Sequence, residues 1–340
     1  MFYLPDTMVN WPWPRAINPH FEDVKTEVDA AFRDFRALDP KSQEAFNKCD
    51  MDHLRIGCDL MNVFFIFDEY SDKENAAVTK EMVDIVLDAL HHPHKMRPEG
   101  ECILGEIMRQ FWARAIQTAS QSFQRHFLDS CTAYLHAVVG EAEDRDHSHC
   151  RSIDDYLKLR RDTSGAAPSL TIHEMSMEFP DEVFYHPMIV ELRQYGVELI
   201  VIDNDMASYN REQATGDENH NLITAIMLEL GLDRSGAMAW AARYHTQLEK
   251  QFIDGLAQVP SLETCTDIPG LVKYLNGIAS WVRANHSWSY ESLRYFGTKG
   301  TEIQRSRLVP LLPKIKYGDA SSMTKVNVAD ISNIYATVQL

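Results

Sequence analysis

Apolar residues recur at helical intervals along most of the chain. In residues 21–38, Val24, Val28, Phe32 and Phe35 are spaced three or four positions apart, so they share one face of a helix. The same spacing predicts helices within residues 51–70, 81–92, 103–143, 187–213, 221–230, 234–259 and 268–296. Residues 198–203 are also consistent with a short β-strand, but the residues on either side continue the helical spacing. The chain is therefore predicted to be all-α, with roughly ten or more helices.

Short polar segments that carry proline or glycine separate the predicted helices, at residues 91–100, 160–169, 214–221 and 258–270. Such segments are typical of connections within one bundle, so residues 21–313 are expected to form a single domain. Prolines at positions 5, 12, 14 and 19 predict an irregular N-terminal arm over residues 1–20. The composition changes near residue 314, and a loosely attached tail is expected over residues 314–340.

Composition and charge restrict the possible partners. The chain is 45% hydrophobic and 24% charged, as expected for a globular protein with a sizeable core. Its net charge of −17 argues against nucleic acid or an anionic membrane as partner. No apolar run reaches the roughly 18 residues of a membrane span. Six scattered cysteines and the lack of a secretory signal predict reduced thiols and a cytoplasmic location.

The stretch FFIFDEYSD, residues 64–72, places acidic side chains directly after an apolar run. Asp68 and Asp72 are four residues apart, so on a helix they share a face and repel each other. A cation is therefore expected near them.

A second polar stripe lies in VIDNDMASYNREQ, residues 201–213. On a helix, Asn204, Ser208 and Glu212 present one oxygen per turn along one face. An amide oxygen, a hydroxyl and a carboxylate suit a hard divalent ion, above all Mg²⁺. Arg211 lies close to the same stripe and suits a phosphate. The alternative interpretation of this stripe is a solvated polar face.

Together the two stretches resemble the metal motifs of class I terpene cyclases. DEYSD is similar to their aspartate-rich motif, and Asn204, Ser208 and Glu212 match their second motif, Asn-Asp-x-x-Ser-x-x-x-Glu. RRDTSG resembles their diphosphate-sensing segment, and SLRYF supplies their C-terminal Arg-Tyr pair. Glu69 departs from the aspartate that many members carry. The resemblance spans about residues 10–313 and is strongest to basidiomycete sesquiterpene synthases of the Δ6-protoilludene group.

The resemblance implies a class I terpenoid synthase helical bundle with a central cavity. It also implies ionisation of (2E,6E)-farnesyl diphosphate, 1,11-closure to a humulyl cation and release of Δ6-protoilludene. Three Mg²⁺ ions, for which Mn²⁺ could substitute, would be held by Asp68, Asn204, Ser208 and Glu212, with Glu69 and Asp72 behind these ligands. The diphosphate would be bound by Arg161, Arg211, Arg294 and Tyr295, and its binding would be relayed by Ser164 and Gly165.

The hydrocarbon part of the site must be apolar, because water or a nucleophilic side chain would quench a carbocation. Phe64, Phe65 and Trp288 are candidates for an aromatic wall that stabilises the cation, and Phe65 and Trp288 are preferred. Ordinary core packing is the alternative for each of them.

Two other functions compete with this assignment: a cyclase that makes a different sesquiterpene, and a helical interaction protein that has lost catalysis. The intact metal residues favour an enzyme, which is expected to be a monomer or a homodimer. Two clusters could suggest zinc, but both are expected to lie in surface loops because neither has partners at structural-site spacing. They are His91, His92 and His94, and His147, His149 and Cys150.

Overall fold

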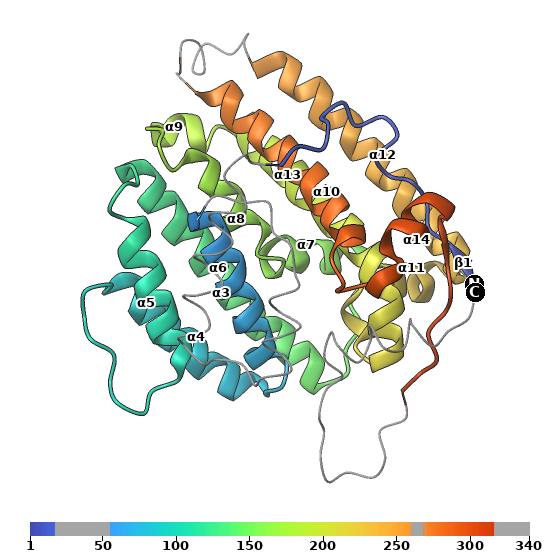
Figure 1. The fold of residues 1–340 in the computed structure, drawn as a ribbon, viewed down its shortest axis with the longest axis horizontal. Coiled ribbons are helices and arrows are strands. Elements are labelled where there is room, and N and C mark those ends of the chain that lie inside the picture. Colours follow the sequence, from blue (N-terminus) through green and yellow to red (C-terminus); the bar gives the residue numbers. More distant parts are fainter. Residues whose placement is uncertain (18–54, 260–267, 269, 316–340) are drawn as a thin grey trace.

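The computed structural model describes residues 1–17, 55–259, 268 and 270–315, which are mostly helical (Figure 1). This confirms the all-α prediction. The helix expected within residues 21–38 and the tail beyond residue 315 lie outside the described residues. The α-helices are α3 (Arg55–Ser71), α4 (Ala76–His91), α5 (Ile103–Ala115), α6 (Gln121–Asp146), α7 (Ile153–Thr163), α8 (Ala166–Thr171), α9 (Asp181–Phe184), α10 (Pro187–Thr215), α11 (Leu222–Leu230), α12 (Arg234–Gln258), α13 (Leu271–Glu291) and α14 (Gly300–Ser306).

Polar side chains fix where several helices begin. In four cases the capping side chain accepts a hydrogen bond from the backbone N–H three residues later, which satisfies a donor that the helix leaves free; the caps are Asn75, Ser120, Ser152 and Asp233. Helix α10 ends at Gly216, whose φ of 91° suits a residue without a β-carbon. Short 3₁₀ turns complete the connections: η1 (Ile172–Glu174), η2 (Glu218–His220) and η5 (Gly297–Lys299).

The helices form two groups, each with its own apolar core. Helices α3 to α6 pack around one core, which includes Phe67, Phe111 and Phe127 (Figure 1). The later helices pack with the N-terminal arm around the other core, which includes Leu199 and Ile278. Residues of both groups line one cavity.

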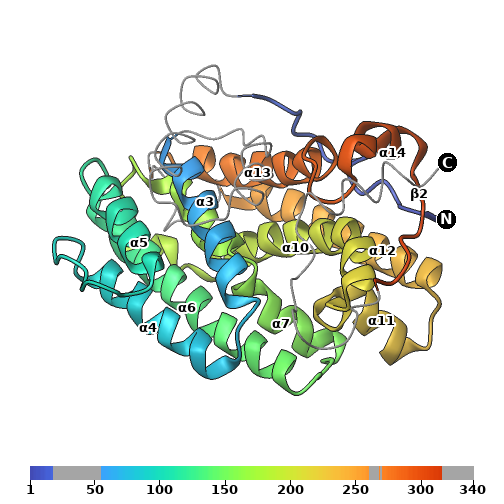
Figure 2. The same cartoon turned by 60° about the horizontal axis from the view of Figure 1, so that its bottom comes forward.

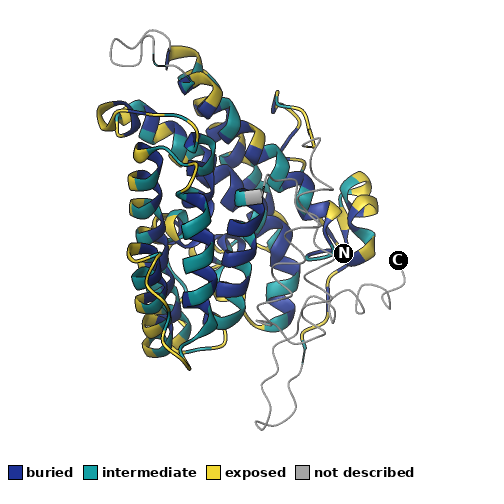
Figure 3. Ribbon diagram, turned by 60° about the vertical axis from the view of Figure 1, so that its left-hand side comes forward, coloured by how far each residue is buried: buried dark blue, intermediate teal, exposed yellow. Residues whose placement is uncertain are grey.

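Helix α10 is the central element of the second group. It packs against both α12 and α13 (Figure 2), and residues 197–203 are buried without interruption. Across the described helices, buried residues gather on the sides that face the interior, and exposed residues lie on the outside (Figure 3). Burial on every side explains why residues 198–203 also look like a buried strand in the sequence. No helix in the described ranges has the length and apolar composition needed to cross a membrane.

The N-terminal arm is irregular apart from one short strand. That strand, β1 (Phe2–Tyr3), pairs antiparallel with β2 (Leu308–Val309). Further along, the buried Trp11 donates its Nε1–H to the carbonyl oxygen of Ala279 at 3.0 Å. Arg15 Nε donates to Glu291 Oε1 at 2.7 Å. The arm is therefore held by β2 at its start and by α13 further along.

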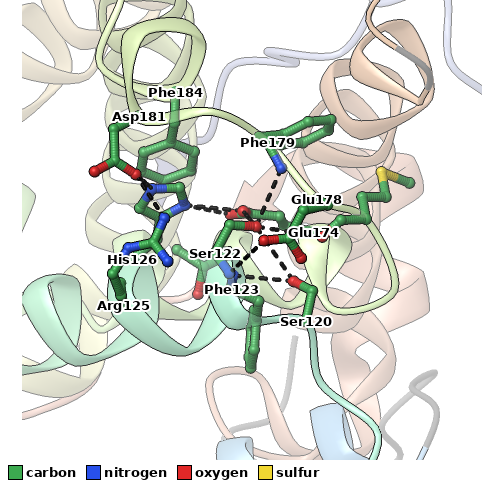
Figure 4. Close-up of polar contacts among 12 residues, drawn as sticks. Ser120, Ser122, Phe123, Arg125, His126, Glu174, Glu178, Phe179, Asp181 and Phe184 are labelled. Carbon is green, nitrogen blue, oxygen red and sulfur yellow. Dashed lines mark hydrogen bonds and ion pairs between the residues drawn. The ribbon is translucent and has the colours of Figure 1, made fainter.

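A buried polar cluster joins the first helix group to the connection between α8 and α10 (Figure 4). Glu174 is fully buried and accepts a hydrogen bond from Ser122 Oγ at 2.8 Å. The two ring nitrogens of His126 lie 2.8 Å from Glu174 and 3.2 Å from Asp181. The same ring stacks on Phe184, with centroids 3.6 Å apart. These polar groups satisfy one another, as burial requires.

Candidate active site

A cavity of about 700 Å³ lies between the two helix groups and is lined by α3, α6, α7, α8, α10 and α13. On α3, Phe65 lines the cavity one turn before Asp68; on α10, Ile200 does so one turn before Asn204. Residues three or four apart share a helix face, so each helix contributes first an apolar and then a polar part of the lining. Trp281 adds to the apolar part. One cavity therefore combines an apolar wall with a polar end.

The end of α3 brings Asp68 and Asp72 to the polar end. Asp72 Oδ1 lies 3.7 Å from Arg145 Nη1. Arg145 also donates to the carbonyl oxygen of Ser71 at 2.9 Å, which satisfies an acceptor at the end of the helix. Glu69 instead faces Lys73, with Oε2 and Nζ 3.3 Å apart. The basic residue beside Asp72 is thus supplied by α6.

Carboxyl groups gather here in surroundings that disfavour their charge. Burial, and then the nearby Asp72, raise the pKa of Asp68 to about 7. Burial raises the pKa of Glu141 to about 8, and it also raises the pKa of Glu212. A cation between these groups would favour their ionised forms. The polar end is therefore suited to positive charge.

The stripe on α10 lies at the same end of the cavity. Asn204 and Glu212 line it, whereas Ser208 is only 1% exposed. Asn204 donates its side-chain N–H to Tyr295 Oη at 2.7 Å. The amide oxygen on the other side, Asn204 Oδ1, accepts a hydrogen bond from Arg160 Nη2 at 3.1 Å.

Arg160 and Arg161 point in different directions. Arg160 lines the cavity and also lies 3.3 Å from Asp205 Oδ1. Arg161 Nε donates to Glu198 Oε1 at 2.6 Å, and Tyr244 donates to the other oxygen of that carboxylate at 2.7 Å. Neighbouring residues on a helix are about 100° apart, so the two arginine side chains leave α7 in different directions. The resemblance predicts a diphosphate contact from Arg161, but the cavity is lined by its neighbour Arg160.

Aromatic rings and a guanidinium meet where α3 approaches the end of α13. Phe65 stacks on Trp288, with centroids 5.6 Å apart. The Trp288 ring meets Tyr295 edge-on at 5.8 Å. The guanidinium carbon of Arg294 lies 5.0 Å from the Phe65 centroid. Arg211 also lines the cavity, beside Tyr295. The apolar wall and the basic groups are thus in direct contact.

Gly165 stands at the break between α7 and α8. Its φ is 66°, and a β-carbon there would lie 3.2 Å from the Phe64 ring, so conformation and space both favour glycine. Ser164 Oγ accepts a hydrogen bond from the Ala166 N–H at 3.2 Å. Both residues line the cavity. Phe64 itself is buried against Tyr134, with centroids 4.7 Å apart, so it belongs to the core of the first helix group.

Comparison with known proteins identifies this arrangement. A family model described as "Terpene synthase family 2, C-terminal metal binding" matches residues 59–251, more than half of the chain. The chain belongs to the terpene synthase family. It is 52% identical to sesquiterpene synthase 14 of Postia placenta over 93% of each chain. It is also 52% identical to Delta(6)-protoilludene synthase 18 of that organism, over 92% of this chain and 93% of the relative.

Solved structures support the same fold at low sequence identity. The linalool/nerolidol synthase of Streptomyces clavuligerus has a TM-score of 0.71 at 17% identity, covering 82% of this chain and 98% of that one. An α-eudesmol synthase has a TM-score of 0.72 at 19% identity, covering 84% and 100%. The predicted class I terpenoid helical fold is confirmed.

The donor set of this terpene synthase fits a divalent metal ion shared with a substrate. Among the described residues, no three His, Cys, Asp or Glu side chains lie close enough to hold an ion by themselves. Asp68 approaches from α3, and the oxygens of Asn204 and Glu212 approach from α10. Hard oxygen donors in small number suit an ion that completes its coordination with water and phosphate oxygens.

Neither histidine cluster supports a zinc site. His91, His92 and His94 are exposed, as are His147 and His149. Four of the histidines, His92, His94, His147 and His149, thus lie at the surface outside the helices, whereas His91 is the last residue of α4 and Cys150 is half-buried. His149 also lines the cavity.

Several lining residues of the terpene synthase carry no signal in the sequence. Glu141 faces the cavity from α6, and its Oε2 lies 3.2 Å from His220 Nε2. In the sequence, Glu141 belongs to the acidic run EAEDRD, which looks like an ordinary solvated helix end. The sequence also offers no reason to choose Arg160, because the family pattern is matched at Arg161.

Proposed function

We propose that this terpene synthase is a sesquiterpene synthase that converts (2E,6E)-farnesyl diphosphate to Δ6-protoilludene and diphosphate. The observation that carries the proposal is one cavity with oxygen donors and guanidinium groups at one end and aromatic side chains beside them. Oxygen donors and guanidinium groups are needed to stabilise the diphosphate as it leaves. Aromatic and apolar side chains are needed to protect the carbocation from water. The names of the relatives, at 43–52% identity over nearly the whole chain, support the substrate and the product.

The polar end would bind the diphosphate together with Mg²⁺, of which three ions are proposed, or with Mn²⁺ as a substitute. Asp68 would hold metal from α3, and Asn204, Ser208 and Glu212 would hold it from α10. When bound, these ions stabilise the negative charge of the departing diphosphate. Asp72 and Glu69 would not bind metal directly but would contribute negative charge to the electrostatic field at Asp68. The donor set is proposed to bind metal only together with the diphosphate, because it has few ligands of its own.

Basic side chains would bind the diphosphate directly. Arg211, Arg294 and the Tyr295 hydroxyl are proposed to donate hydrogen bonds to it, because charge-assisted bonds to phosphate oxygens are strong. Arg160 is added to this set on the strength of its place in the cavity. Arg161, which the resemblance predicts to sense the diphosphate, bonds to Glu198 and is proposed to link α7 to α10 through it. Ser164 and Gly165 would pass the effect of binding to α8.

The apolar wall would fold the farnesyl chain and exclude water. Phe65 and Trp288, which stack on each other, would offer aromatic faces to the cation. Closure between C1 and C11 would give a humulyl cation, and further ring closures with loss of a proton would give the product. A different cyclic sesquiterpene is the second candidate, because a relative at the same 52% identity is named only as a sesquiterpene synthase.

The function is tested by incubating the purified full chain with farnesyl diphosphate and Mg²⁺ and analysing the extract by gas chromatography and mass spectrometry. The expected result is one main hydrocarbon that co-elutes with authentic Δ6-protoilludene and is absent when EDTA is added. A different cyclic sesquiterpene would reject the product but retain the reaction. Release of no hydrocarbon by folded protein would favour the non-catalytic alternative.

Replacing Trp288 with leucine is expected to redistribute products without stopping ionisation. The change removes an aromatic face worth about 0.5–2 kcal/mol to a nearby cation, and about 1.4 kcal/mol separates routes that differ tenfold in rate. The Trp288→Leu enzyme should therefore release more of the less-cyclised hydrocarbons. Product ratios from gas chromatography measure this.

Trp240→Leu is the matched control, because Trp240 packs on Tyr244, with centroids 5.4 Å apart, away from the cavity. Its product profile should equal that of the wild type. An unchanged single product from Trp288→Leu at an unchanged rate would show that Trp288 is ordinary core.

A further inference from the structure

Asn221 is a fully buried polar residue at the start of α11. Its Oδ1 accepts a hydrogen bond from the Ile223 N–H at 2.8 Å, which caps the helix. Its Nδ2 donates in the other direction, to Glu212 Oε2 at 2.8 Å, and it also lies 3.4 Å from Ser208 Oγ. One side chain thus connects the start of α11 to two of the residues assigned to metal.

We propose that Asn221 is a positioning residue for the metal-binding stripe of α10. Its amide group fixes the Glu212 carboxylate and the Ser208 hydroxyl from behind, so that α10 presents both oxygens in a set orientation. Outer hydrogen-bond partners of this kind orient metal ligands. The inference rests on the proposed function, because it concerns how the same metal residues are held.

The chemistry at this position requires both halves of an amide. The cap needs an acceptor, and the contacts to α10 need N–H donors, which asparagine combines in one short side chain. Aspartate or serine would retain an acceptor for the cap. Neither would offer the two N–H donors of the amide.

Three further hydrogen bonds, all to Asp205, hold Asn221 and the start of α11 in place. Asn221 Nδ2 also donates to the Asp205 carbonyl oxygen at 2.9 Å. The next residue, Leu222, donates its N–H to Asp205 Oδ2 at 3.0 Å, and Tyr156 Oη donates to the same oxygen at 2.5 Å. Asp205 is 1% exposed. Consecutive residues of α11 are therefore tied to α10 behind the cavity, where the stripe can be fixed without blocking it.

The test compares Asn221→Asp with the wild type for Mn²⁺ binding in the presence of inorganic diphosphate, followed by electron paramagnetic resonance of free Mn²⁺. Aspartate keeps the cap but removes the donors and places a carboxylate beside Glu212. We expect the Mn²⁺ dissociation constant to rise by about 10- to 100-fold, the usual effect of losing an outer partner of a metal ligand. The Mg²⁺ concentration for half-maximal turnover should rise in parallel, more than kcat falls.

Asn75→Asp is the matched control, because Asn75 caps α4 by the same kind of bond, 3.1 Å to the Val78 N–H, outside the cavity lining. It should leave Mn²⁺ binding unchanged. In a Glu212→Gln background the Asn221→Asp change should have a much smaller effect, because the two residues act through one contact. Circular dichroism checks folding throughout.

Unchanged Mn²⁺ affinity in folded Asn221→Asp would reject the positioning role and leave Asn221 as a helix cap. Asn221→Ser, which adds no negative charge, is the second variant; if neither variant folds, Asn221 serves the fold and the proposal is equally rejected. Failure of the wild type to bind Mn²⁺ with diphosphate is a different result, because it would overturn the metal assignment in the proposed function and this inference with it.

Discussion

Replacing Asp68 with alanine is expected to lower turnover of farnesyl diphosphate by at least about 10²- to 10³-fold, the scale on which loss of one electrostatic contribution to a transition state acts. Asp68 is the oxygen donor proposed on the α3 wall, opposite the stripe of α10. Without it the metal and the diphosphate would be held from one side only. Initial rates at saturating Mg²⁺ measure the loss.

The same variant should fold at least as well as the wild type. Because the pKa of Asp68 is raised to about 7, the ionised carboxylate is disfavoured in the folded protein without metal. The carboxyl group stabilises the fold relative to the unfolded chain at low pH, and this contribution is lost as the pH rises through about 7. The melting temperature of metal-free Asp68→Ala at pH 8 should therefore equal or exceed that of the wild type.

Asp84→Ala is the matched control for both measurements. Asp84 is an exposed aspartate on α4, paired with Lys80 at 2.7 Å, and such surface pairs contribute little. Its rate and melting temperature should stay near those of the wild type. Wild-type turnover by folded Asp68→Ala would show that α3 supplies no essential metal ligand.

The second large effect is expected at Arg160 and not at Arg161. Lysine keeps the positive charge at either position but loses the planar fork of donors that matches phosphate. Arg160→Lys should lower kcat/KM by roughly 10- to 100-fold, because displacing a contact at the reacting group by about 1 Å can cost that much. It should also weaken inhibition by inorganic diphosphate. Arg161→Lys should change both by a small factor only, since lysine can still pair with Glu198.

These two variants form a matched pair of neighbouring residues with the same substitution. Lysine was chosen because a neutral residue at position 160 would leave the buried Asp205 without its charged partner, which destabilises proteins strongly. Circular dichroism should show equal folding. If Arg161→Lys is the more damaged enzyme, the family pattern has identified the diphosphate contact correctly, and Arg161 must leave Glu198 when substrate binds.

The sequence by itself determined the helical class and the two facing motifs. Asp68 and Asp72 share a helix face because they are four residues apart, and the same holds for Asn204, Ser208 and Glu212. Such relations depend only on the period of the helix, so they can be read before the fold is known. The resemblance then supplied what spacing cannot, namely the chemistry that the two motifs serve together.

Tertiary structure alone decided which side chains reach the cavity. The rotation of α7 places Arg160 in the cavity and Arg161 against Glu198, and no periodicity sets that rotation. Phe64 and Phe65 are separated in the same way into core and cavity wall. Asn221 meets Glu212 only because α11 folds back on α10. These contacts depend on how helices pack against one another, which side chains distant in the sequence determine together.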